Sequence, residues 1–378
     1  MGEFRGRPRN SPSYWFSMKR YPMFDPPEYV AWRPDKEITD EYCRVLQQDP
    51  ERAAIVEKLE VDALLALYAG MVRFRLHDTT LYRWVRQGII SKAWLGTGEE
   101  AVTIGSVHAL DRKVDVVGPL IRNAGACHEM GISLADMLRA YLATADSPGA
   151  GKDFHIGRLQ AGVVATTSQM GALVPVFAGI GLAFKQRGEK RVALTWVGDG
   201  ATKTTPSHEG LNLAAVLRAP VVYVFQNNQI ALGTPLERHQ KGPFPAWARA
   251  YGVTGLECAG NNVLDVFAAV RIAAAQARAG KGPCIVFAET FRMGGHATHD
   301  EREARTILPP ALFDFWGKRD PLGVYESYLE RRDIPKSALE TIENQIIAEM
   351  ADAEQQALAS RETNMPEPES ALRGVYAE

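Results

Sequence analysis

The 378-residue sequence lacks any apolar run close to the roughly 18 residues that a membrane span requires. It also has little net charge, formally −2, so neither nucleic acid nor an acidic membrane is expected as a main partner. Its four cysteines show no CxxC spacing, and no secretory signal precedes them. This usage predicts reduced, mostly buried thiols and a cytoplasmic location instead of a disulfide framework. Hydrophobic residues make up 46% of the chain, which is ample for a buried core.

The first 50 residues differ in composition from the rest of the chain, because they are rich in arginine, serine, proline and aromatic residues. We predict that residues 1–50 form an extended arm that lies on a partner or on the domain surface. Mitochondrial transit peptides have a related composition, but Glu3 and the scattered prolines disrupt an amphipathic helix, so the mitochondrial matrix is the less favoured location. No linker or repeat interrupts residues 51–330, which are predicted as one α/β domain, and residues 331–378 are predicted as a helical tail.

Residues 191–234 predict a strand–helix–strand unit. The apolar runs 192–197 and 221–225 are typical of buried parallel strands. Between them, Thr205 is a suitable cap for a helix with Pro206 at its first position. A right-handed crossover of this kind predicts an α/β fold with a doubly wound, largely parallel sheet.

Polar residues follow both strands of this unit. Asp199 lies between Gly198 and Gly200 after the first strand, and Asn228 ends a Gln-Asn-Asn sequence after the second. Parallel strands place these residues at the same carboxyl edge, where a carboxylate, an amide and a nearby carbonyl suit Mg²⁺. The glycines allow the backbone to approach a phosphate. For either motif alone a tight turn or a polar loop is the favoured interpretation, but together they predict a metal-bridged diphosphate.

The combination of GDG, a helix and NN, with Asn228 placed 29 positions after Asp199, resembles the thiamine diphosphate signature. From about residue 59 onward the chain is similar to the α subunit of the E1 component of 2-oxo acid dehydrogenase complexes. The resemblance implies that Asp199, Asn228 and the carbonyl of Ile230 hold Mg²⁺. It also implies that Gly200 and Ala201 lie against the diphosphate of the cofactor.

The same resemblance assigns roles to four more residues. Arg122 would bind the diphosphate, although its aromatic neighbour in the family is replaced by Ile121 and one phenol hydrogen bond is lost; the alternative is an ordinary surface arginine. His155 would line the channel to the cofactor, or else be a loop histidine with local partners. Ser168 and Met170 would contact the bent cofactor, with a core methionine as the alternative for Met170.

Another predicted strand leads into a polar loop that contains Arg292, His296, His299 and Asp300. His296 and His299 are three positions apart in a loop and lack the fixed helical face that zinc sites of this spacing use, so a metal site with Asp300 is the minor alternative. The resemblance implies that His296 donates to an oxyanion or moves a proton, with Arg292 close by. Family members often carry a phosphorylated serine after this histidine, and Ala297 rules out that switch at this position.

Glu99 and Glu100 open a predicted helix after Gly98. Acidic residues are favoured at a helix start by the helix dipole, so they need no further role. The related subunits carry a Gly-Gln/Glu-Glu-Ala motif here, close to the cofactor. Both interpretations stay open from the sequence.

The resemblance implies a reaction in which a 2-oxo acid is decarboxylated and its acyl group passes to the lipoyl group of an E2 component. Branched-chain substrates are favoured over pyruvate. In the family the activating carboxylate lies on a β subunit, so we expect an active site between chains of an α₂β₂ heterotetramer. One alternative is an acetoin dehydrogenase α subunit. Another is a non-catalytic scaffold with the same fold, which the departure Lys203-Thr204-Thr205-Pro206 after GDGAT supports.

Overall fold

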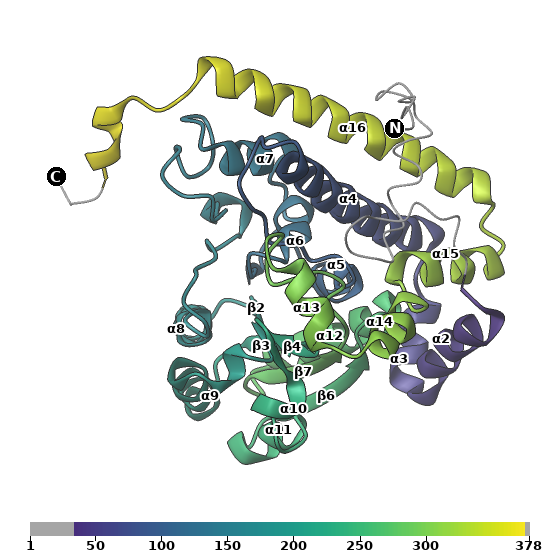
Figure 1. Cartoon of the computed structure of the whole chain (residues 1–378). Helices are drawn as coiled ribbons and strands as arrows, with labels where there is room; N and C mark the ends of the chain where they lie inside the picture. Colours follow the sequence, from purple (N-terminus) through teal and green to yellow (C-terminus); the bar gives the residue numbers. More distant parts are fainter. Residues whose placement is uncertain (1–33, 375–378) are drawn as a thin grey trace.

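The computed structural model describes residues 34–374, so most of the predicted arm and the C-terminal Val375–Glu378 lie outside the described residues. A five-stranded parallel sheet lies at the centre, in the order β1-β2-β3-β7-β6 (Figure 1). The strands are β1 (Val116–Gly118), β2 (Ala193–Gly198), β3 (Val221–Asn227), β6 (Thr254–Ala259) and β7 (Cys284–Glu289). Two short strands, β4 (Ile230–Ala231) and β5 (Thr234–Pro235), pair antiparallel beside it.

Helices cover both faces of the sheet, because alternate strand residues point to opposite sides. Helix α12 (Val263–Arg278) lies against one face, with α5 (Glu100–His108) and α4 (Val61–Arg86) packed beyond it. Helices α8 (Leu173–Gln186) and α9 (Thr205–Leu217) pack together on the other face, near α11 (Ala246–Tyr251). The predicted doubly wound α/β fold is therefore confirmed.

Several helix ends agree with the local sequence signals. The hydroxyl of Ser133 accepts a hydrogen bond from the backbone N–H of Asp136 at 3.1 Å and caps α7 (Leu134–Leu142). The Asp320 side chain caps α15 (Pro321–Arg331) in the same way. Helix α9 starts one residue earlier than predicted, since Thr204 is its cap and Pro206 lies inside its first turn, where a missing N–H costs nothing.

The extended arm was predicted too long, because residues 36–48 form helix α2 (Lys36–Gln48) and α3 (Pro50–Glu57) follows. Ile38, Tyr42 and Leu46 recur every four residues and are buried, which gives α2 one apolar face. That face packs against α15 and α3. The prolines before residue 34 hid this periodicity from the sequence analysis.

The C-terminal tail is helical, as predicted, and consists mainly of α16 (Lys336–Thr363), which runs along α4 and α7 (Figure 1). The remaining helices connect the larger elements and are α6 (Ala124–Glu129), α10 (Leu236–His239), α13 (Glu301–Ile307), α14 (Pro310–Gly317), η1 (Leu159–Ala161), η2 (Ala201–Lys203) and η3 (Pro368–Leu372). Cys127, Cys258 and Cys284 are buried and Cys43 partly so, all as free thiols. Within residues 34–374 no helix is both long and apolar enough to span a bilayer.

Candidate cofactor and metal site

The GDG and NN motifs meet at one edge of the sheet, as the sequence predicted. Gly198 at the end of β2 pairs in register with Gln226 of β3, and Gln226 pairs with Ala288 of β7. The loops that follow are in contact, because a Cβ added to Gly200 would lie 2.5 Å from the Cβ of Ala231. The glycine therefore allows a close approach of two loops.

Two buried oxygen atoms at this edge have the properties of metal ligands. Asp199 Oδ1 accepts from the backbone N–H of Gly200 at 2.9 Å, whereas Oδ2 has no hydrogen-bond partner among the described residues and lies 3.5 Å from His239 Nε2. Asn228 donates through Nδ2 to Glu99 at 2.8 Å, and its Oδ1 has no hydrogen-bond partner within the described chain. Buried acceptors without donors are costly in a protein, and a hard cation would satisfy both. The residues fit Mg²⁺.

The third predicted ligand, the carbonyl of Ile230, accepts a hydrogen bond from Arg292 Nη1 at 3.2 Å. A carbonyl oxygen has two lone pairs, so this contact leaves one for a cation. Residues 34–374 contain no group of three His, Cys, Asp or Glu side chains that could hold a metal. The candidate set is of another kind, because it combines a single carboxylate with an amide and a carbonyl.

Two buried arginines give this edge a positive potential. Arg122 donates to the carbonyl of Leu95 at 3.0 Å and to His296 Nδ1 at 3.2 Å, while Arg292 donates only to carbonyls, those of Gly294, Ile230 and Leu232. In the described part of the chain neither arginine forms an ion pair. Burial, with Arg122 nearby, lowers the pKa of Arg292 to about 9. Buried cations without carboxylate partners suit an anion such as a diphosphate.

His296 is neutral at this site. Burial, Arg122 and Arg292 together lower its pKa to about 4. Since Arg122 donates to Nδ1, the ring proton is on Nε2, which is available to donate. This is consistent with the predicted role of His296 as a donor to an oxyanion.

His155 and Ser168 form a separate pair. His155 contacts Asp153 through Nδ1 at 2.7 Å and Ser168 Oγ through Nε2 at 3.1 Å. No hydrogen bond connects this pair to the arginines in residues 34–374. Met170 is 63% exposed, so the alternative of a core methionine is wrong. The predicted cofactor contacts of these residues stay predictions.

Sequence reasoning left open the role of Glu99, whose side chain is fully buried. Its Oε1 accepts from Gln226 Nε2 at 2.5 Å and from Asn228 Nδ2 at 2.8 Å. Burial raises the pKa of Glu99, against the opposing effect of Arg122. The Glu-Glu pair at the helix start was the available signal, but the sequence did not show which strand it faces.

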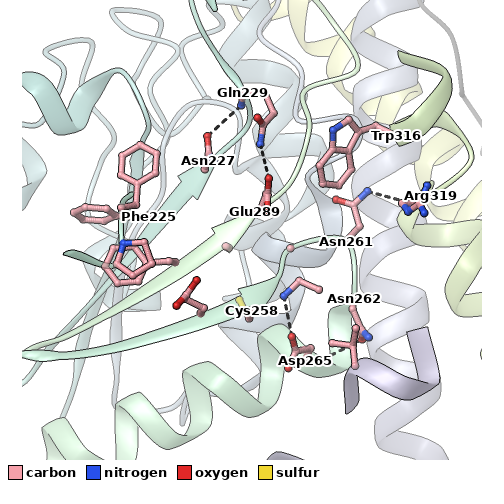
Figure 2. Close-up of a pocket in the computed structure, with 18 of the residues that line it drawn as sticks. Phe225, Asn227, Gln229, Cys258, Asn261, Asn262, Asp265, Glu289, Trp316 and Arg319 are labelled. Carbon is pink, nitrogen blue, oxygen red and sulfur yellow. Dashed lines mark hydrogen bonds between the residues drawn. The ribbon is translucent and has the colours of Figure 1, made fainter. Parts of the chain in front are cut away.

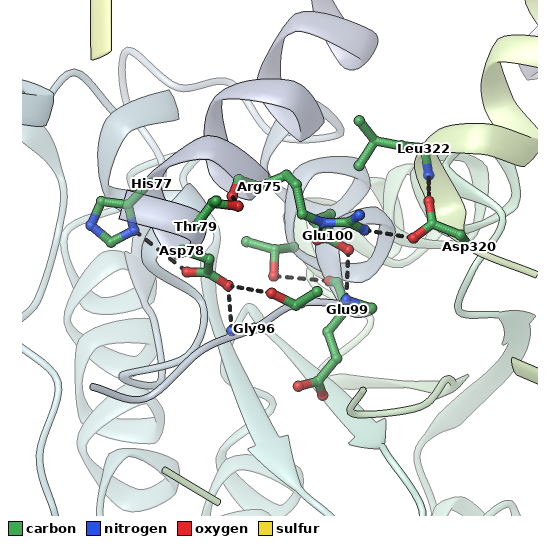
Figure 3. Close-up of polar contacts among 12 residues, drawn as sticks. Arg75, His77, Asp78, Thr79, Gly96, Glu99, Glu100, Asp320 and Leu322 are labelled. Atoms are coloured by element: carbon green, nitrogen blue, oxygen red, sulfur yellow. Dashed lines mark hydrogen bonds and ion pairs between the residues drawn. The ribbon is translucent and has the colours of Figure 1, made fainter. Parts of the chain in front are cut away.

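The neighbouring residue Glu100 contacts a different part of the fold (Figure 3). Glu100 forms an ion pair with Arg75 of α4, which also contacts Asp320 at 2.9 Å. The N–H of Gly98 donates to Glu100 at 2.9 Å, while the carboxyl of Glu99 points away from Arg75 (Figure 3). One acid therefore anchors α5 to α4, and the other reaches the sheet edge.

A cavity of about 1020 Å³ opens beside the ends of β3, β6 and β7 (Figure 2). Some of its polar side chains contact one another or the backbone: Gln229 donates to Glu289 at 3.3 Å, and Asn261 donates to the carbonyl of Arg319 at 2.8 Å. Asp199 Oδ2 and Asn228 Oδ1, two of the buried oxygen atoms that lack a hydrogen-bond partner among the described residues, lie instead at the edge that carries the GDG and NN motifs. The edge that carries these two residues is therefore the candidate cofactor site.

Comparison with known proteins agrees with this geometry. Residues 68–367 match the family described as dehydrogenase E1 component. The chain belongs to the dehydrogenase E1 component family. The expectation of an E1 α subunit is thereby confirmed.

Similar members of this E1 family are named α subunits. The 2-oxoisovalerate dehydrogenase subunit alpha of Bacillus subtilis is 30% identical over 82% of this chain and 94% of its own length. The 3-methyl-2-oxobutanoate dehydrogenase subunit alpha of Mycobacterium tuberculosis is 33% identical over 75% of this chain and 74% of its own length. The human mitochondrial 2-oxoisovalerate dehydrogenase subunit alpha is 28% identical over 81% of this chain and 68% of its own length. The family implies thiamine diphosphate as cofactor, with a β subunit and an E2 component as partners.

Proposed function

We propose that this E1 α subunit binds thiamine diphosphate through Mg²⁺ held by Asp199, Asn228 and the Ile230 carbonyl. The observation that carries the proposal is the pair of buried acceptors, Asp199 Oδ2 and Asn228 Oδ1, that lack close donors among the described residues. The loop contact at Gly200 and Ala231 keeps the two motifs together. Bound thiamine diphosphate supplies the electron sink for decarboxylation of a 2-oxo acid.

The other residues would hold the anionic end of the cofactor and exclude water from it. Arg122 and Arg292 supply buried positive charge, and neutral His296 supplies an N–H on Nε2. Such donors are already in place before a ligand arrives, so little reorganisation is needed. His155 and Ser168 would lie at the approach to the site.

The proposed substrate is a branched-chain 2-oxo acid, because the relatives described above carry 2-oxoisovalerate or 3-methyl-2-oxobutanoate in their names. The proposed assembly is an α₂β₂ heterotetramer in the cytoplasm that transfers the acyl group to lipoylated E2. The β subunit would supply the activating carboxylate, so the α chain alone should not decarboxylate the substrate.

The test is a titration of thiamine diphosphate, with and without Mg²⁺, into the chain co-purified with its β subunit. Asp199→Ala should abolish Mg²⁺-dependent binding while the complex stays assembled, because it removes the only charged ligand of the set. Asp352→Ala, on the exposed surface of α16, is the matched control. Cofactor affinity that is unchanged in Asp199→Ala would refute the site.

Turnover then separates the candidate substrates. We expect the complex to use 2-oxoisovalerate faster than pyruvate or acetoin, and the α chain alone to use none of them. Substantial turnover by a monodisperse α-only sample would refute the split site, and a preference for acetoin would favour the acetoin dehydrogenase alternative.

A non-catalytic scaffold remains the second candidate, and one contact favours it. His239 lies 3.5 Å from Asp199 Oδ2, and that carboxylate raises the pKa of His239, so a histidine cation could replace the metal. Metal-independent stability together with no cofactor binding by the complex would support the scaffold.

A further inference from the structure

Glu99 is joined to Asn228 across the contact between α5 and the end of β3. Asn228 Nδ2 donates to Glu99 Oε1 at 2.8 Å, and both side chains are buried. Glu99 comes from the N-terminal cap of α5, so it reaches the proposed metal site from another part of the chain.

This contact determines which way the Asn228 amide faces. The NH₂ group of Asn228 is the one that meets Glu99 Oε1, an oxygen that also accepts from Gln226 Nε2. The Oδ1 atom of Asn228 then faces away from Glu99, where it is buried without a donor among residues 34–374. The orientation thus follows from hydrogen-bond chemistry.

Further hydrogen bonds connect Glu99 to the side chains around it. Gln226 donates its Nε2 to the same Glu99 oxygen and accepts from Asn123 Nδ2 at 2.9 Å through its own oxygen. Asn123 also donates to Thr103 Oγ1 at 2.7 Å. These bonds orient the Gln226 and Asn123 amides, while Asn123 Oδ1 and Glu99 Oε2 are buried without a hydrogen-bond partner among residues 34–374.

We propose that Glu99 is a positioning residue, which holds the Asn228 amide so that its oxygen faces the Mg²⁺ of the cofactor. The inference rests on the proposed function. Without Glu99, the amide is free to rotate by half a turn and to present its NH₂ to the cation. The site would then lose one of its ligands.

The complex of this chain with its β subunit is purified without cofactor. Thiamine diphosphate is then added, and Mn²⁺ serves as a paramagnetic probe that replaces Mg²⁺. Metal affinity is measured by electron paramagnetic resonance. We expect Glu99→Ala to weaken Mn²⁺ binding about 10- to 100-fold, which is the usual effect of removing a residue that orients a ligand. Glu99→Gln should stay near the wild-type affinity, because glutamine keeps an oxygen that accepts from Asn228.

A double-mutant cycle tests whether Glu99 acts through Asn228. In an Asn228→Ala background, Glu99→Ala should cause no further loss of Mn²⁺ affinity. Glu343→Ala is the matched control, because it removes another buried carboxylate, bonded to Tyr68, from the distant helix α16. This control should lower the melting temperature without changing metal affinity.

A swapped pair keeps the proposal testable where Glu99→Ala fails to assemble. Asn228→Asp alone should bind Mn²⁺ poorly, because two buried carboxylates would face each other. Adding Glu99→Gln to Asn228→Asp restores a donor and should recover binding.

Three results would overturn the proposal: unchanged affinity in Glu99→Ala, additive losses in the cycle, or a Glu99→Gln loss as large as that of Glu99→Ala. The last result would show that Glu99 affects Mn²⁺ affinity through its negative charge and not by orienting the Asn228 amide. Failure of the wild-type complex to bind Mn²⁺ with thiamine diphosphate would refute the proposed function instead.

Discussion

Gly200→Ala tests whether the close contact of two loops holds the candidate site together. The added Cβ would lie 2.5 Å from the Cβ of Ala231, well inside the roughly 3.5–4.0 Å optimum for two carbon atoms. Gly200 has helical angles, φ −66° and ψ −36°, so alanine brings no backbone strain. The whole effect is then a steric separation of the loops that follow β2 and β3.

The cost of this overlap should be about 1–3 kcal/mol, the usual range when a methyl group is forced into a packed region. We expect a melting temperature several degrees lower than that of the wild-type complex, and weaker Mg²⁺-dependent cofactor binding because Asp199 and Asn228 move apart. Gly198→Ala is the matched control, since an added Cβ there has no described heavy atom within 4 Å. Both changes reduce the entropy of the unfolded chain equally, so that effect cancels in the comparison.

The assay is thermal unfolding of the complex purified without cofactor, followed by a cofactor titration. Ala231→Gly removes the opposing methyl group, so the double variant Gly200→Ala with Ala231→Gly should regain most of the lost stability. A Gly200→Ala complex as stable as Gly198→Ala, or no rescue by Ala231→Gly, would show that the loops do not depend on this contact.

Three other outcomes are expected. Arg75→Met should lower the free energy of unfolding in urea by about 3–5 kcal/mol, because Glu100 and Asp320 would stay buried without their cation. The control Arg331→Met breaks an exposed pair with Asp40 and should lower it by about 0–1 kcal/mol. Equal losses in the two variants would contradict the reasoning. His296→Ala should impair acyl transfer to a lipoyl domain more than decarboxylation with an artificial electron acceptor, and equal losses in both assays would argue against that role. The pKa of His296 is lowered to about 4 in the folded chain, against 6.5 for an ordinary histidine, so between these pH values the unfolded chain binds more protons than the folded chain. The free energy of unfolding should therefore rise with pH across this window and level off above it. His296→Ala should flatten this rise, and an unchanged pH profile would show that His296 is not responsible.

The sequence by itself determined the parts of the fold that depend on local signals. Helix α4 depends on such signals, because its apolar residues recur with helical spacing and Gly88 follows its end. Asp199 and Asn228 were placed at one edge because two apolar strands joined by a helix must run parallel. The family was recognisable for the same reason, since its motifs sit at the ends of these strands.

Only the tertiary structure decided the contacts that connect distant segments. Strand β6 was not predicted because exposed and partly buried residues alternate along most of it at the sheet edge, without an apolar run. The contact of Glu99 with Asn228 spans 129 positions, and the one between His155 and Ser168 depends on how two loops fold back. Local spacing carries no information about such pairs, because packing of the whole chain brings them together. The two neighbouring acids at the start of α5 are alike in sequence, and it is the helix's rotation over the sheet that directs Glu100 to Arg75 and Glu99 to the site.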